Sequence, residues 1–275
     1  MGARWADLMG FRAGPAFPAQ QRCLLAVAQD NDDVQYDHAL RKKNEAGGPG
    51  GIAAIEGIRD RLVSRFVAAA LAEEADIDIA DGGAAQDHYR TSKAYFLLGR
   101  ALHIVQDSFS TFHGTRHPPD YRSLIQVNSY VCTPNAPVHP HVTPGVRDLL
   151  WSDARPNGDI IWNDGCKPET AECLKVEYVA AVDASTDLWG GFLQARQAKA
   201  EERETLARQI VNAFLDTWMQ VPASIPDAGA PEDCSLPELA NLNQRRDACL
   251  AITGRQDAEQ SPPFNWDKKS LSGIP

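Results

Sequence analysis

The feature that most constrains the fold of this chain is an apolar segment that carries ionisable side chains. This segment is the stretch YFLLGRALHIVQDSFSTFHGTR, from Tyr95 to Arg116. Within it His103 and Asp107 are four residues apart, and His113 follows six residues later. Positions i and i+4 share one face of an α-helix, so the imidazole and the carboxylate can point to one spot, to which His113 can return from just beyond the helix end. Two imidazoles and a carboxylate in apolar surroundings are a ligand set that zinc takes. The alternative is a buried, hydrogen-bonded pair that binds no metal.

Helical periodicity predicts four helices, with approximate bounds 52–75, 86–106, 174–200 and 204–219. The second helix is apolar on nearly its whole circumference, so we expect it to be central and its polar residues to need a partner or a metal. We find no strand-like alternation of any length and no internal repeat in the sequence. The predicted fold class is all-α, a compact bundle of mostly long helices around a metal site.

Irregular segments flank and separate these helices. Residues 1–50 contain scattered Gly, Pro and charged residues, and residues 113–172 are rich in Pro, Asn, Asp and Gly. A loop as long as the second segment is commonly functional. The remainder beyond Val221 is Pro-rich. We therefore expect a helical domain over residues 1–221 and a C-terminal extension over residues 222–275 that packs on it.

The charge of the chain argues against a nucleic-acid partner. The 275 residues contain 27 Lys and Arg against 37 Asp and Glu, a net charge of −10. This balance does not favour attraction of a polyanion such as duplex nucleic acid. No run approaches the roughly 20 apolar residues that a membrane span needs. The first residues lack the continuous apolar region of a secretory signal, so we expect a signal to be absent or already removed.

The chain has an even number of cysteines. Two pairs are close in sequence, Cys166 with Cys173 and Cys234 with Cys249, and two local disulfides in an oxidising compartment are one interpretation. Under that interpretation the protein is secreted or periplasmic. The alternative is a set of buried thiols in a cytosolic protein. The full set is Cys23, Cys132, Cys166, Cys173, Cys234 and Cys249.

The run LLGRALHIVQDSFSTFH resembles the central helix of the superfamily of zinc-dependent phospholipases C and single-strand-specific nucleases. The motif of that helix is His, three residues, Asp, five residues, His, and His103, Asp107 and His113 match it without a gap. LARQIVNAFLDTWMQ is similar to the closing helix of the family, and QYDHALRKK resembles the segment that supplies an isolated metal histidine, here His38. The resemblance covers roughly residues 20–220.

One departure from the family pattern favours the phospholipase branch. The nuclease branch typically has Gln-Pro shortly before the last histidine of the motif, where this chain has Ser110 and Thr111. The sequence QDSFS looks more like the bacterial phospholipase C relatives.

The resemblance implies a cluster of up to three zinc ions that activates water and neutralises phosphoryl oxygens. It also implies an aspartate, before the isolated histidine, that orients or deprotonates the attacking water. Of Asp30, Asp32 and Asp33 we favour Asp33, and a solvated acidic loop is the alternative.

The remaining ligands of the family are less well matched. The family has a further His with a Glu four residues later, a pair that this chain lacks after His113. His139 or His141 could take that place, and we prefer His141, with Asp159 as the carboxylate. Family members also use an N-terminal Trp and an early histidine. Trp5 is present, but no histidine lies between it and His38, so a third metal position is altered or missing, or this start is not that of the mature protein.

The function expected from this resemblance is hydrolysis of a phosphodiester by metal-activated water. The favoured activity is a phospholipase C that cleaves a glycerophospholipid to diacylglycerol and a phosphorylated head group, in transient contact with a membrane surface. The alternatives are a nuclease or 3'-nucleotidase of the same superfamily, and a non-catalytic helical protein with a structural metal. Four aromatic residues in loops could line a groove for the apolar part of a lipid, although ordinary packing would also explain them: Phe112, Tyr121, Trp151 and Trp162.

Overall fold

The computed structural model describes residues 32–42, 45, 47–80, 88–110, 113–128, 152–154, 160–162 and 176–225. This part of the chain is mostly helical, as the sequence predicts. It contains a short 3-10 helix, η2 (Asp32–His38), and the α-helices α3 (Gly47–Leu71), α4 (Lys93–Asp107), α6 (Val176–Gln197) and α7 (Ala200–Trp218). The bounds of α6 and α7 agree with the predicted ones to within a few residues.

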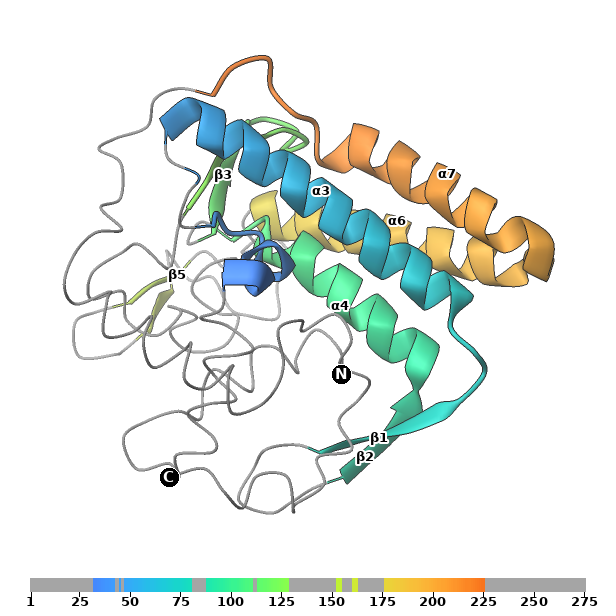
Figure 1. The fold of residues 1–275 in the computed structure, drawn as a ribbon. Helices are drawn as coiled ribbons and strands as arrows, with labels where there is room; N and C mark the ends of the chain where they lie inside the picture. Colours follow the sequence, from blue (N-terminus) through green and yellow to red (C-terminus); the bar gives the residue numbers. More distant parts are fainter. Residues whose placement is uncertain are drawn as a thin grey trace, which may run out of the picture.

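The four long helices pack side by side around one hydrophobic core (Figure 1). Helix α3 packs against α4 and α7, while α6 packs against α7 and α4. Each helix contributes fully or almost fully buried side chains, among them Phe66 from α3, Leu98 from α4, Phe192 from α6 and Val211 from α7. The short η2 lies against α3 and α4.

Helix α3 begins earlier than its apolar periodicity indicates. The segment GGPGG, most of which lies in the part expected to be irregular (residues 1–50), forms the start of this helix. Pro49 is compatible with this start, because a residue in the first helical turn needs no backbone N–H for the helix. The helix ends at Leu71 rather than near residue 75.

The expectation of a chain without strands was wrong. Strand β1 (Asp76–Ala80) pairs antiparallel with β2 (His88–Ser92), with Asp76 opposite Ser92. Residues 88–92 therefore belong to a strand and not to the predicted second helix. Helix α4 begins at Lys93 because Ser92 is still extended, with φ −65° and ψ 132°. Five residues of alternation are too few to be distinguished from a loop without knowledge of the partner strand.

Two further short hairpins lie in the segment predicted to be irregular. Strand β3 (Gly114–Arg116) pairs with β4 (Leu124–Val127), and β5 (Ser152–Ala154) pairs with β6 (Ile160–Trp162). The first hairpin begins at Gly114, seven positions after the last residue of α4, and it fixes the main chain of His113, whose carbonyl accepts a hydrogen bond from the N–H of Asn128 at 2.7 Å.

After α7 the described chain continues to residue 225, and Ile225 is 8% exposed in the hydrophobic core. The rest of the predicted C-terminal extension and all six cysteines lie outside the described residues, so the domain boundary at residue 221 and the disulfides stay predictions. None of the helices in the described part is long and apolar enough to cross a membrane.

Candidate metal centre

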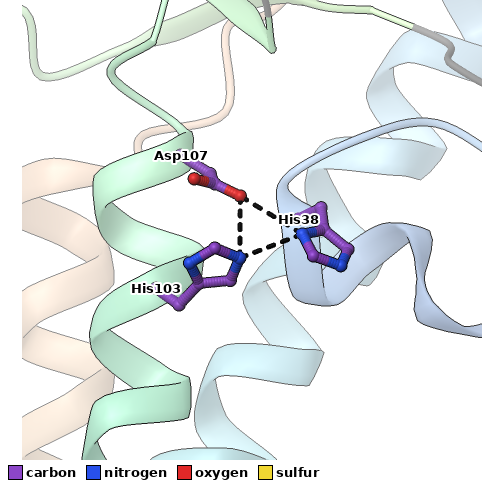
Figure 2. A group of neighbouring side chains, drawn as sticks. All are labelled: His38, His103 and Asp107. Carbon is purple, nitrogen blue, oxygen red and sulfur yellow. Dashed lines mark hydrogen bonds and ion pairs between the residues drawn. The ribbon is translucent and has the colours of Figure 1, made fainter. Parts of the chain in front are cut away.

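Three side chains that could bind a metal ion converge at the C-terminal end of α4 (Figure 2). The Nε2 atom of His103 lies 2.9 Å from Nδ1 of His38 and 3.0 Å from Oδ2 of Asp107. The distance between Nδ1 of His38 and Oδ2 of Asp107 is 3.4 Å. All three residues are buried, with exposures of 1% to 5%. The predicted ligands His38, His103 and Asp107 are thus brought together.

The secondary structure explains how these residues meet. His103 and Asp107 are one helical turn apart on α4, and Asp107 is the last residue of that helix. His38 is the last residue of η2, and it reaches the same spot because η2 packs against α3 and α4. The rings of His38 and His103 meet edge to face, with an interplanar angle of 87°.

His113 lies beside this group. Its Nδ1 atom is 3.6 Å from Oδ2 of Asp107 and is hydrogen-bonded to the backbone carbonyl of His38. A carbonyl only accepts, so Nδ1 of His113 carries the proton in this contact. The three residues whose ligand atoms all lie within 4.8 Å of one another do not include His113. Its place as a metal ligand stays a prediction, whereas its contact with His38 is a feature of the fold.

The spacing and chemistry of the three ligand atoms fit a zinc ion. Zinc bonds to nitrogen and carboxylate oxygen are about 2.0–2.1 Å long, and in a tetrahedral site the ligand atoms are then about 3.3 Å apart. The distances among His38, His103 and Asp107 are 2.9, 3.0 and 3.4 Å. Three protein ligands leave a fourth tetrahedral position for water or substrate.

The electrostatics keep Asp107 ionised. Burial by itself would raise the pKa of this carboxyl group. The opposing effects of His103 and His113, together with hydrogen bonds from His103 and His38, outweigh burial and hold the pKa well below its usual value. An ionised carboxylate is the form that binds a cation.

A buried ionic cluster surrounds Asp37, the residue before His38, and it was not predicted from the sequence. The carboxylate of Asp37 accepts two hydrogen bonds from Arg65, from Nε to Oδ1 and from Nη2 to Oδ2, each 2.8 Å long. Nη2 of Arg100 lies 3.4 Å from Oδ2 and Nη1 of Arg61 lies 3.8 Å from it. Burial would raise the pKa of Asp37, but Arg100, Arg65 and Arg61 outweigh it and lower the pKa. A sequence signal did exist, since Arg61 and Arg65 are one turn apart on the apolar helix α3.

The other predicted site residues are not joined to this group by the described structure. Asp33 lies in η2 and Trp162 in β6, but their side chains are outside the described part. Tyr121 is partly buried and packs against the hydrophobic core, which agrees with the alternative that this residue serves ordinary packing. Four residues lie wholly outside the described part: Phe112, His141, Trp151 and Asp159.

Comparison with known proteins adds one relative. The chain is 35% identical over 228 residues to Hemolysin-1 of Aeromonas salmonicida. The match covers 80% of this chain but 39% of that protein, so the chain spans about two fifths of the length of this relative. No family model and no solved structure matches the chain.

Proposed function

We propose that this chain is a metal-dependent phosphodiester hydrolase, most simply a phospholipase C that releases diacylglycerol and a phosphorylated head group from a glycerophospholipid. The observation that carries the proposal is the buried group of His38, His103 and Asp107, whose potential ligand atoms lie 2.9–3.4 Å from one another. The resemblance of the His103, Asp107 and His113 spacing to zinc-dependent phospholipases C supplies the reaction class.

The curated relative is compatible with a lipid substrate. It is named a hemolysin, and cleavage of membrane phospholipids is one way to lyse a cell. The chain corresponds to only part of that protein, so activity on lipid, contact with a membrane surface and a secreted or periplasmic location are all parts of this proposal.

The chemistry assigned to each residue follows from its environment. His38 and His103 would each bind the ion through one ring nitrogen, and Asp107 would add a carboxylate that is ionised at neutral pH. A bound zinc ion would supply a water molecule with a pKa near 7 and would neutralise phosphoryl oxygens. Asp33 is proposed to orient the attacking water, and His113, His141 and Asp159 to complete a cluster of up to three ions.

The test is a measurement of bound metal and of substrate choice on the same preparation. We expect zinc by elemental analysis and release of phosphocholine from phosphatidylcholine vesicles that stops on treatment with a chelator and returns with Zn²⁺. His103→Ala should abolish the activity. His117→Ala is the matched control, because His117 is exposed on the chain between β3 and β4 and should be dispensable.

Two other outcomes would contradict the proposal in different ways. Hydrolysis of single-stranded DNA or of 3'-nucleotides without hydrolysis of lipid would identify the nuclease branch. Bound metal without any phosphodiesterase activity would identify a structural metal site.

A further inference from the structure

Three arginines contact the carboxylate of Asp37, the residue directly before His38. Arg65 binds both carboxylate oxygens at 2.8 Å, and Arg100 and Arg61 approach one of them to 3.4 and 3.8 Å. Asp37, Arg65 and Arg100 have exposures of 4%, 5% and 9%. We call these four residues the Asp37 clamp. Paired planar contacts from a guanidinium fix the orientation of a carboxylate as well as its position.

The clamp joins η2 to both helices that build the metal centre. Arg61 and Arg65 come from α3, while Arg100 comes from α4, one turn before His103. The same helix that carries two of the ligands therefore also holds the residue next to the third ligand. The relative position of η2 and α4, on which the distance between His38 and His103 depends, is set in part by the contact between Asp37 and Arg100.

Helix η2 needs such an external support. It has seven residues, and 3-10 helices have poorer hydrogen-bond geometry than α-helices and are seldom long. The chain leaves it through Ala39, which has a φ of 51°. A left-handed conformation is unfavourable for a residue other than glycine, and surrounding structure must hold it. His38 sits at this junction.

A purely stabilising role explains the clamp less well. The loss of hydration on burial of charged groups offsets most of their mutual attraction, so a buried ion pair is weak evidence of stabilisation. Its better-attested effect is to select one arrangement of the surrounding elements. Replacement of residues that do not bind the metal themselves but orient its ligands commonly changes the metal affinity.

We propose that Asp37 is a positioning residue, whose clamp holds His38 at coordination distance from His103 and Asp107 and thereby sets the metal affinity of the site. This inference rests on the proposed function only in that it requires the three residues to bind a metal. It does not depend on the substrate.

The test compares metal affinity in variants of the full chain that remain folded. Asp37→Asn keeps the size of the side chain and removes its charge. We expect its dissociation constant for Zn²⁺, measured by competition with a chromophoric chelator, to increase about ten- to a hundredfold. The visible absorption of the Co²⁺ form should also weaken, because that spectrum reports the four-coordinate geometry.

The matched control is Leu215→Ala, a core substitution on α7, which carries none of the residues of the metal centre. It should lower the melting temperature and leave both the Zn²⁺ affinity and the Co²⁺ spectrum unchanged. If Asp37→Asn does not fold, the Zn²⁺ affinity and Co²⁺ spectrum of Arg61→Gln test the positioning role instead. Arg61 makes the longest contact and its side chain is 13% exposed, so this variant should fold and show a smaller weakening in the same direction.

The outcomes separate this inference from the proposed function. Folded Asp37→Asn or Arg61→Gln protein with wild-type Zn²⁺ affinity and Co²⁺ spectrum would overturn the positioning role, even if the wild type hydrolyses lipid. Weakened metal binding in a protein without phosphodiesterase activity would leave the positioning role intact and refute the function. Absence of metal binding in the wild type would refute both.

Discussion

Arg116 offers the sharpest test of how the end of α4 is held in place. Its guanidinium is buried and donates to the backbone carbonyls of Ser108, Tyr121 and Trp218 at 2.9, 2.7 and 2.6 Å. It also donates to the hydroxyl of Ser108 at 2.6 Å and lies over the ring of Phe109, 3.7 Å from its centre. One side chain thus joins the C-terminal ends of α4 and α7, where the helix dipoles favour a positive charge.

Replacement of Arg116 by Met would keep much of the volume and remove all of these donors. Each hydrogen bond from a charged donor contributes about 1.5–3 kcal/mol, and the carbonyls of Ser108, Tyr121 and Trp218 would lose this partner, two of them in buried contacts. Burial lowers the pKa of Arg116 to about 9, so the cost of burying its charge offsets part of the gain. We expect Arg116→Met to lower the free energy of unfolding by about 3–5 kcal/mol.

The assay is urea unfolding of the full chain followed by circular dichroism. Arg116→Lys should lie between the wild type and Arg116→Met, because an ammonium group cannot reproduce the planar fork. The control is Arg208→Met, which removes an exposed ion pair with Glu204 and should cost no more than about 0.5 kcal/mol. If Arg116→Met lowered the free energy of unfolding by no more than the control does, this account of the helix ends would be refuted.

Three further predictions concern metal, acid and packing. Zinc bound at the proposed site should raise the melting temperature, since an ion at one hundred times its dissociation constant adds about 2.7 kcal/mol to the free energy of unfolding, and calorimetry with and without a chelator would check this. Folding lowers the pKa of Asp37, so the stabilising effect of its carboxylate is complete above about pH 4 and is lost as the pH falls further. In the metal-free protein, the free energy of unfolding should therefore depend less steeply on pH in the acid range for Asp37→Asn than for the wild type. Gly190→Ala should be more stable than Gly191→Ala by about 1 kcal/mol or more in urea, because a Cβ at Gly190 meets nothing within 4 Å and one at Gly191 comes within 2.4 Å of Ile210.

Local spacing in the sequence predicted the local parts of the site. The shared face of His103 and Asp107 follows from helical geometry alone, and the structure brings the two side chains to 3.0 Å. The hairpin of β1 and β2 was missed because strand pairing depends on a partner and not on the strand itself. The segment HYRTS, which forms β2, directly precedes an apolar helix, and its residues were assigned to that helix.

The contacts of Asp37 and His38 form only in the folded chain, but the polar residues of α4 already indicate in the sequence that buried partners are needed. Arg100, His103 and Asp107 occupy positions i, i+3 and i+7, a single polar stripe on an otherwise apolar helix. Such a stripe must be matched by buried partners, because isolated charges are costly in a core. Two consecutive residues of η2 supply them: Asp37 meets Arg100, and His38 meets His103 and Asp107. The clamp and the candidate metal centre are therefore neighbouring parts of one buried polar layer, which is why a change in Asp37 should alter metal binding at the proposed site.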